Sequence, residues 1–283
     1  MGIVIGINAS RSRSGGAMAH LCGILNECNP GLNGIEKIHI WSYNSMNDVL
    51  PDRPWLIKHT PPELAKSLIK QIFWEKWQLP NEIIKNKCDI LLNTDAGTVC
   101  RYSPSIVISQ DMLSYEKGEM SRFGFTLARF RLIALKYIQA FSMKHANGVI
   151  FLTNYASKTI QQNIGRIDQF RIIPHGVDEI FRQKYVGGDW GLNSSEDIQC
   201  IYVSNAAMYK HQWHLVNAIS KLRIKGYRIK ILLVGGGKGP AQKLLERTIS
   251  ELDPQRDFVE QTPFMKHDAL PKILSTADIF VFA

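Results

Sequence analysis

The sequence of 283 residues lacks the long apolar runs of a membrane protein. Its longest stretches without Asp, Glu, Lys or Arg, such as residues 146–157, are about a dozen residues long and contain polar side chains. A membrane-spanning helix needs about 20 mainly apolar residues. The first ten residues also have no basic residue ahead of their apolar run, unlike a secretory signal. We therefore expect no membrane span, no signal peptide and a cytoplasmic location.

Cysteine is also scarce, and the usual motifs of metal and nucleotide sites are missing. The five cysteines are odd in number and form no CxxC pair, which favours reduced structural thiols over a disulfide framework. There is no GxGxxG, P-loop, GxSxG or zinc-ribbon spacing. His211 and His214 lie three residues apart without an HExxH pattern or an acidic third ligand, so we expect no metal and no cofactor.

The composition is that of a globular protein, with 45% apolar and 21% charged residues. The length suits two domains. The net charge of +9 is concentrated in residues 1–175, which have 20 Lys and Arg against 13 Asp and Glu; the remainder has 14 against 12. This imbalance predicts an anionic partner for the first half, with phosphate esters, an anionic lipid surface or nucleic acid as candidates. Nucleic acid is the weakest of these, since no recognisable binding module occurs.

Short β-branched runs alternate with longer amphipathic segments along the whole chain, which predicts an α/β fold with parallel sheets. Such sheets bind ligands at the carboxyl ends of their strands. A polar, glycine-containing stretch over residues 176–197 separates two series of strands. The predicted strands are residues 3–7, 37–43, 89–93, 105–109, 149–153 and 171–174 in the first series, and 199–204, 230–234, 257–260 and 278–282 in the second.

The helices between the strands have their own start and stop signals. Thr60, Pro61, Pro62 and Glu63 form a capping box with proline in the first turn, which predicts a helix to about residue 77. Gly226 is placed to end a helix that starts near residue 208. Residues 121–144 predict one basic, aromatic helix, suited either to an anionic lipid surface or, more ordinarily, to a solvated charged face.

A glycine pair, Gly15 and Gly16, follows the first strand and opens a helix, with Arg11 and Arg13 just before it. Backbone amides at a helix N-terminus approach a phosphate closely where glycine removes the side chain. The alternative is a plain strand-to-helix turn. At the ends of other strands, Asp95, Asp111 and Glu116 are candidates for acid/base chemistry or, more simply, caps and surface groups.

The second series of strands has a similar pattern. Lys210 follows a strand and is expected in the first turn of the next helix, where a cation is unfavourable by about 0.3–1 kcal/mol unless an anion is bound there. Gly235, Gly236 and Gly237 follow the next strand. A solvated lysine and a flexible turn are the alternatives, but the recurrence of glycine loops after strands favours nucleotide binding.

Taken in order, several passages resemble bacterial family 4 glycosyltransferases, which are retaining enzymes of the GT-B fold. The resemblance is nearest to members that build O-antigen and other surface polysaccharides. The matching passages are SRSGGAMAHL, SQDMLSYE, GVIFLTNYAS, IIPHGVDEIF, YVSNAAMYKHQWHLVNAI, ILLVGGG and LPKILSTADIFVFA. Together they cover the chain nearly from end to end.

The resemblance implies a GT-B pair of Rossmann-like domains, an acceptor-side domain of residues 1–177 and an incomplete nucleotide-sugar domain of residues 178–283. It implies a hexosyltransferase-type enzyme that transfers sugar, with retention, from a nucleotide-sugar to a polyprenyl-diphosphate-linked glycan at the cytoplasmic membrane face. Gly15, Gly16 and Lys210 would bind the donor diphosphate. The loop of Gly235, Gly236 and Gly237 would let the nucleoside approach. Arg11, Arg13, Gln110 and Asp111 would face the acceptor.

The chain also departs from the family pattern. Asn205 occupies the place of an arginine five residues before the lysine, and a histidine in the loop after the fourth strand is either replaced by Gln110 or displaced. The family's two donor-sugar glutamates, seven residues apart, would follow residue 282, so we expect a truncated donor domain and assign no catalytic residue. The alternative function is an inactive fragment that binds only an acceptor or a partner transferase.

Overall fold

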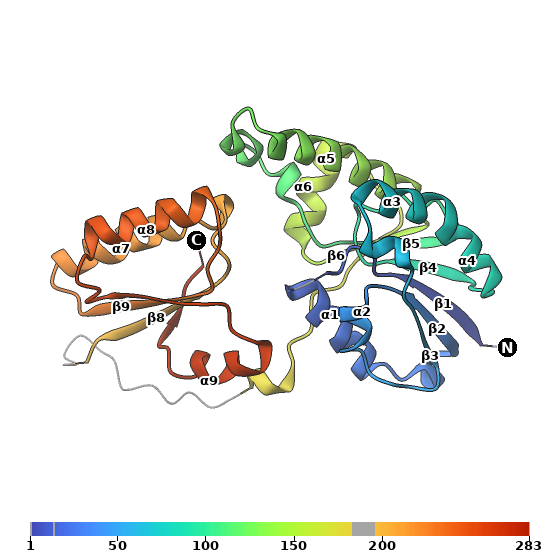
Figure 1. Ribbon diagram of the computed structural model, residues 1–283, viewed down its shortest axis with the longest axis horizontal. Coiled ribbons are helices and arrows are strands. Elements are labelled where there is room, and N and C mark those ends of the chain that lie inside the picture. The colour runs from blue at the N-terminus through green and yellow to red at the C-terminus, as the bar shows by residue number, and fades with distance from the viewer. Residues whose placement is uncertain (1, 14, 183–195, 283) are drawn as a thin grey trace. The chain divides into compact units, whose positions relative to one another are not determined.

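The computed structural model describes residues 2–13, 15–182 and 196–282 (Figure 1). Contacts divide the chain into unit 1, Met1–Gly176, and unit 2, Val177–Ala283. The division falls one residue before the predicted boundary. Each unit is an α/β domain with its own sheet and core, and all the described strand pairs in both sheets are parallel. The expected fold class is therefore confirmed.

Unit 1 contains a seven-stranded sheet in the order β3-β2-β1-β4-β5-β6-β7. The order reverses direction beside β1, where the chain crosses from β3 to β4, and such switch points form ligand sites in open sheets. Its strands are β1 Ile3–Asn8, β2 Ile35–Trp41, β3 Leu56–His59, β4 Ile90–Asn93, β5 Ser105–Ser109, β6 Gly148–Phe151 and β7 Phe170–Ile172. Its α-helices are α1 Gly15–Glu27, α2 Asn44–Asn47, α3 Leu68–Phe73, α4 Leu79–Lys85, α5 Leu127–His145 and α6 Asn154–Ile164.

Helices cover both faces of this sheet, with α1 and α2 on one face and α3 to α6 on the other (Figure 1). Alternate residues of the strands supply the two cores, as the pleat requires. On β2, Ile38 and Ile40 pack with Leu21 and Leu25 of α1. Trp41, the next residue on the strand, joins a second cluster. That cluster also contains Trp74, Leu79, Ile83 and Leu91.

Unit 2 contains a four-stranded sheet in the order β10-β9-β8-β11. Tyr202, Ile231 and Leu233 from the sheet pack with apolar side chains of two flanking helices in one core. The elements are β8 Ile198–Val203, α7 Gln212–Ile224, β9 Ile229–Val234, α8 Pro240–Leu252, β10 Val259–Thr262, α9 Leu270–Leu274 and β11 Ile279–Phe280.

All ten predicted strands are found within a few residues of their expected bounds. The sequence prediction missed β3, which has four residues and no clear alternation of apolar and polar side chains. The strand is specified by its pairing, because β2 and β3 lie in register from Ile38 opposite Leu56 to Trp41 opposite His59. The part of the predicted linker at residues 183–195 lies outside the described residues.

The prediction of one helix from Thr60 to about residue 77 is wrong. Pro62–Ala65 form only a 3₁₀ turn, and Lys66 then adopts an extended conformation with φ −95° and ψ −168°. The amide of Gln71 donates to the carbonyls of Leu64 and Lys66, which stabilises this break. After it, α3 continues through a π-helix, Trp74–Gln78, into α4.

The basic, aromatic segment is also shorter as a helix than predicted. Its first part is a separate 3₁₀ helix, Glu119–Phe123, which Gly124 ends with φ +55°. Thr126 then caps α5 by accepting a hydrogen bond from the N–H of Arg129. None of the helices in the described parts of the chain is long and apolar enough to span a bilayer.

Candidate functional site

A buried polar network lies where β1 ends in unit 1. The side-chain amide of Asn8 donates to Glu75 Oε1 at 3.1 Å and to Asn93 Oδ1 at 2.9 Å. Glu75, in the π-helix, is 2% exposed, and its other oxygen is 2.9 Å from a guanidinium nitrogen of Arg11. Since a buried carboxylate requires a partner, this ion pair fixes Arg11 in place.

Arg13, the second predicted acceptor-side arginine, is also held by its neighbours. Its guanidinium donates to Gln71 Oε1 and lies 4.9 Å from the ring centre of Tyr43. Both arginines are thus oriented by contacts inside unit 1. Their predicted contact with the acceptor stays a prediction.

The glycine pair opens α1 as predicted. Gly15 adopts φ +64°, which glycine reaches without strain. A Cβ built on Gly15 or Gly16 would have no described atom outside its immediate chain neighbourhood within 4 Å. Packing against described residues therefore does not explain these two glycines. The backbone at the start of α1 is left open to a ligand.

The carboxylates predicted near the strand ends divide into two kinds. Asp111 Oδ1 accepts the N–H of Leu113 at 2.9 Å, and Glu116 accepts the hydroxyl of Tyr155 at 3.0 Å. Asp111 is exposed and closes a turn, while the preceding Gln110 is half-buried. Asp95 differs from both, because burial raises the pKa of its carboxyl group, partly offset by the Gly97 N–H and the charge of Arg11.

In unit 2, Lys210 lies beside aromatic rings at the carboxyl end of the sheet. Its Nζ is 4.6 Å from the ring centre of Phe282 and 5.1 Å from that of Tyr209. Its carbonyl accepts the hydroxyl of Tyr202 at 2.8 Å, which ties the lysine to β8. Burial lowers the pKa of the Lys210 ammonium, since the surroundings disfavour an uncompensated charge.

The predicted place of Lys210 in the first turn of a helix is wrong. Lys210 ends a 3₁₀ turn, Met208–Lys210, and His211 follows with φ +51° before α7 begins at Gln212. A left-handed residue between two helical segments breaks them, because helical hydrogen bonds cannot continue through it. Lys210 therefore precedes the helix instead of occupying its positive end. At the other end, Gly226 adopts φ +91°, as its predicted role requires.

The glycine loop after β9 lies directly against the loop after β8. Ala206 N–H donates to the carbonyl of Gly236 at 3.3 Å, and Gly235 N–H donates to Thr262 at 3.0 Å. A Cβ on Gly235 would lie 2.5 Å from the carbonyl oxygen of Ser204. A Cβ on Gly237 would lie 2.9 Å from the carbonyl oxygen of Ala206. These two glycines thus allow two backbone segments of unit 2 to approach each other.

The structure also contains a histidine pair that the sequence gave no reason to expect. Nδ1 of His20, on α1, is 2.8 Å from Nδ1 of His175, which lies 155 residues away in the chain. Burial lowers the pKa of both imidazoles. The rings of His211 and His214 are 5.8 Å apart, and no group of three or more metal-ligating side chains occurs within the described residues.

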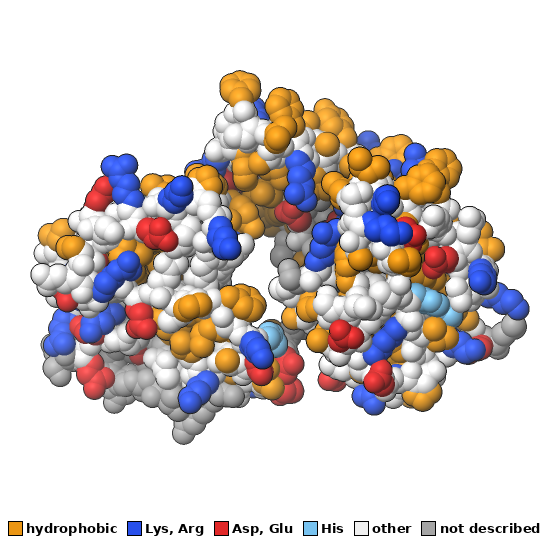
Figure 2. Space-filling view, in the orientation of Figure 1, with side chains coloured by type: hydrophobic (Ala, Val, Ile, Leu, Met, Phe, Trp, Pro, Cys, Tyr) orange, Lys and Arg blue, Asp and Glu red, His pale blue; other side chains and the backbone are white. Residues whose placement is uncertain are grey.

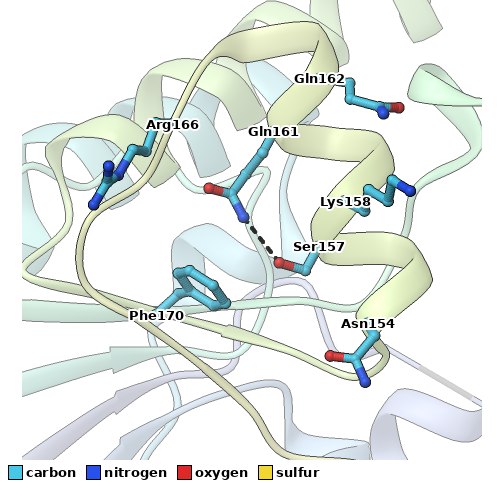
Figure 3. A pocket seen from close by; sticks show the side chains of 7 residues that line it. All are labelled: Asn154, Ser157, Lys158, Gln161, Gln162, Arg166 and Phe170. Carbon is cyan, nitrogen blue, oxygen red and sulfur yellow. Dashed lines mark hydrogen bonds between the residues drawn. The ribbon is translucent and has the colours of Figure 1, made fainter.

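A shallow open pocket lies beside α6 in unit 1 (Figure 3). Gln161 donates to Ser157 Oγ at 2.9 Å within it, and Arg166 pairs with Asp168 at 2.9 Å. Figure 3 shows Phe170 on the opposite side of the pocket from α6. The pocket contains none of the predicted site residues.

Comparison with known protein families gives a match in the second unit. Residues 190–283 match the profile of the family described as "Glycosyl transferases group 1". The match lies wholly within unit 2. A comparison with curated protein sequences finds no match.

Solved structures resemble the chain over both units. Sucrose-phosphate synthase from Thermosynechococcus elongatus has a TM-score of 0.67 at 14% identity, over 98% of this chain and 74% of that one. HepE of Anabaena, in complex with UDP-glucose, has a TM-score of 0.65 at 14% identity, over 99% and 74%. The lipopolysaccharide outer core galactosyltransferase WaaB has a TM-score of 0.60 at 10% identity, over 99% and 73%.

At these identities the likeness establishes the fold, which is that of the GT-B glycosyltransferases. The glycosyltransferase domain in unit 2 and this fold together support an enzyme of the hexosyltransferase type. Sequence reasoning placed both glycine loops directly after strands, as the structure has them, and the binding roles of these loops and of Lys210 stay predictions. It missed the ion pair of Arg11 with Glu75 and the pair of His20 with His175, for which the sequence holds no local signal.

Proposed function

We propose that this protein transfers a sugar, with retention, from a nucleotide-sugar to a lipid-linked glycan during surface polysaccharide synthesis of the O-antigen type. The observation that carries the proposal is the glycosyltransferase domain at residues 190–283. Two further findings support it. HepE was solved with UDP-glucose, and WaaB is a lipopolysaccharide outer core galactosyltransferase.

Within unit 2, the donor diphosphate binds beside Lys210 in this proposal. When the bond between sugar and phosphate breaks, negative charge develops on the diphosphate, and a preorganised cation stabilises it. Lys210 suits this role because burial against Tyr209 and Phe282 already disfavours its unpaired charge. The rigid backbone of Gly235, Gly236 and Gly237 supports the nucleoside. Neutralisation by Lys210 needs no metal, so transfer should continue in the presence of a chelator.

Unit 1 binds the acceptor in this proposal. The open amides at Gly15 and Gly16 bind a phosphate group, as helix N-termini do. Arg11 and Arg13 stand just before them, with Gln110 and Asp111 two strands away. The arginines are held by Glu75, Gln71 and Tyr43, so they meet an anion with little loss of side-chain freedom.

A membrane surface is the proposed location of the acceptor, in line with a peripheral protein at the cytoplasmic face. Around the start of α5, Phe125 is 93% exposed and Leu127 is 88% exposed. Arg129 lies over the ring of Phe125, and Arg131 is exposed nearby. Apolar side chains beside cations suit an interface of anionic headgroups and acyl chains.

The helices α3 and α4, and the π-helix that joins them, lie on the same face of the sheet as α5 and also expose apolar side chains beside cations. Ile69, Trp77 and Ile84 are each more than half exposed. Lys76 lies 4.9 Å from the ring centre of Trp77, and Lys70, six residues earlier, is exposed. Figure 2 shows hydrophobic and basic side chains side by side along these helices, at the top of unit 1 in the view.

Transfer of sugar from nucleotide-sugars to a membrane extract rich in polyprenyl-linked glycans, measured with radiolabelled donors, tests the proposal directly. Isothermal titration with UDP and with GDP tests the donor site. Lys210→Ala should lower the affinity for the nucleoside diphosphate by about ten-fold or more, since a charge-assisted hydrogen bond contributes about 1.5–3 kcal/mol.

The matched control is Lys221→Ala, at the far end of α7, where the lysine is exposed. It should leave the affinity unchanged. Equal affinity in the Lys210 and Lys221 variants would remove Lys210 from the donor site. An absence of transfer and of nucleotide binding would favour the alternative, a fragment that only binds an acceptor or a partner.

A further inference from the structure

Two glutamine side chains pair with each other beside the glycine loop of unit 2. Gln242 lies on α8 and Gln261 on β10. Nε2 of Gln242 donates to Oε1 of Gln261 at 3.2 Å, and Nε2 of Gln261 donates to Oε1 of Gln242 at 3.3 Å. Both side chains are half-buried. The two amides therefore form a closed ring of two hydrogen bonds that joins a helix to a strand.

Each amide of the pair also contacts the backbone of the glycine loop. Nε2 of Gln261 donates to the carbonyl of Gly235 at 3.2 Å, and Oε1 of Gln242 accepts the N–H of Gly237 at 3.2 Å. The second N–H of Gln242 donates to Glu246 Oε1 at 2.9 Å. A primary amide has two N–H donors. All four N–H donors of the pair are therefore used within unit 2.

The loop backbone fixes which way each amide is turned. Gly235 presents a carbonyl, so Gln261 must turn its N–H toward the loop. Gly237 presents an N–H, so Gln242 must turn its oxygen toward it. Reversing either amide would place two donors or two acceptors against each other. The pair and the loop therefore fit together in one arrangement.

The rest of the loop is held by backbone hydrogen bonds. Gly235 N–H donates to Thr262 at 3.0 Å, and the carbonyl of Gly236 accepts the N–H of Ala206 at 3.3 Å. Among the residues that the structure describes, no acceptor is found for the N–H of Gly236. The loop thus has a fixed shape and keeps this backbone donor for a ligand.

We propose that Gln242 and Gln261 are positioning residues for the nucleoside of the sugar donor. They act through the loop, whose shape they fix before a nucleotide binds, so that little conformational freedom is lost on binding. The inference rests on the proposed function, in which this loop supports the nucleoside. It adds the two side chains that give the loop its shape.

The first test variant is Gln261→Glu, measured on the whole chain. It keeps the size of the side chain but replaces the Nε2 donor with an oxygen, which faces the carbonyl of Gly235 and Oε1 of Gln242. At pH 8 the affinity for UDP or GDP, whichever the parent binds, should fall at least five-fold in isothermal titration. The matched control is Gln255→Glu, at an exposed glutamine of unit 2, which should leave the affinity unchanged.

A second variant, Gln242→Ala, introduces no charge. It removes the acceptor of the Gly237 N–H, and alanine favours the helix in which residue 242 lies. The nucleotide affinity should fall at least three-fold. Inorganic pyrophosphate distinguishes positioning from a loss of folding, because it has no nucleoside. Both glutamine variants should bind pyrophosphate as the parent does, whereas Lys210→Ala should lower the affinity for pyrophosphate as well as for the nucleotide.

Hydrogen exchange tests the loop without any ligand. Peptides that contain Gly237 should exchange several-fold faster in both glutamine variants than in the parent and the Gln255 control. Unchanged exchange, unchanged nucleotide affinity, or an equal loss of pyrophosphate and nucleotide affinity would each overturn the inference while leaving the proposed function in place. A parent chain that binds neither UDP nor GDP would overturn the proposed function and this inference together.

Discussion

Replacing Gly235 with alanine should destabilise unit 2 far more than the same change at its neighbour Gly236. Gly235 adopts φ +108°, a conformation that residues with a side chain rarely reach. Its Cβ would lie 2.5 Å from the carbonyl oxygen and 2.9 Å from the carbonyl carbon of Ser204. Both atoms belong to the backbone, so no side chain can move to make room.

The size of the effect follows from two contributions. Holding a residue with a side chain in a sparsely populated backbone conformation costs about 1–3 kcal/mol. Forcing an extra carbon into a filled space costs about 1–3 kcal/mol more. The backbone cannot easily relax, because Ser204 N–H is bonded to Val234 at 2.9 Å and Gly235 N–H to Thr262 at 3.0 Å. We expect the free energy of unfolding to fall by about 2–6 kcal/mol.

Gly236→Ala is the matched control. Its Cβ would have no neighbour closer than 3.7 Å, which is ordinary contact, and the residue does not require a positive φ. A change of this kind stays within about 0.5 kcal/mol. The two variants differ by one position in the same loop, so their composition and charge are identical.

Urea unfolding followed by far-ultraviolet circular dichroism measures the difference. With a slope of about 2 kcal/mol per molar urea, the midpoint for unit 2 should fall by about 1–3 M in Gly235→Ala. Hydrogen exchange of peptides from β8 and β9 would assign the loss to unit 2. Equal midpoints for the two alanine variants would refute the packing argument.

Two further predictions concern other parts of the molecule. Asp253, which is 3% exposed, accepts hydrogen bonds from the N–H groups of Asp257, Phe258 and Val259; Asp253→Ala should lower the free energy of unfolding by about 2–4 kcal/mol, and a loss below 0.5 kcal/mol in urea unfolding would contradict this. Replacing both Phe125 and Leu127 with serine should reduce co-sedimentation with phosphatidylglycerol vesicles several-fold. Serine at Leu32, a leucine of unit 1 that is 83% exposed, serves as the control, and equal sedimentation of both variants would contradict the membrane proposal.

The strands were the most predictable part of the fold, because buried parallel strands consist of continuous β-branched and aliphatic runs. Residues 105–109, predicted from such a run, form β5 with the expected bounds. β3 was missed because its four residues depend on pairing with β2 at the edge of the sheet. The helix expected from Thr60 failed for a different reason: a local capping pattern was outweighed by the extended conformation of Lys66 and the bonds from Gln71.

The candidate site was predictable only as a set of loops. The loops that contain Gly15, Gly16 and Gly235 were predicted from the sequence alone, because glycines follow the ends of predicted strands there. The ion pair of Arg11 was not predictable from the sequence. Glu75 is 64 residues away and lies in a π-helix, which has no recognisable pattern in the sequence. The hydrogen bond from Asn8 to Asn93 likewise depends on the strand order, which places β4 beside β1.

The two glycine loops look alike in the sequence, but different physical requirements explain them. At Gly235 and Gly237, the protein requires a residue without a Cβ, because backbone atoms of the neighbouring loop occupy the space where a Cβ would lie. At Gly15 and Gly16, no described atom outside the immediate chain neighbourhood occupies it. Glycine in the first case is required for unit 2 to fold, so its substitution should reduce stability before it affects any ligand. Glycine in the second case leaves the start of α1 accessible. A substitution at Gly16 should therefore reduce ligand binding while the stability of unit 1 changes little, whereas one at Gly15, with φ +64°, would also strain the backbone.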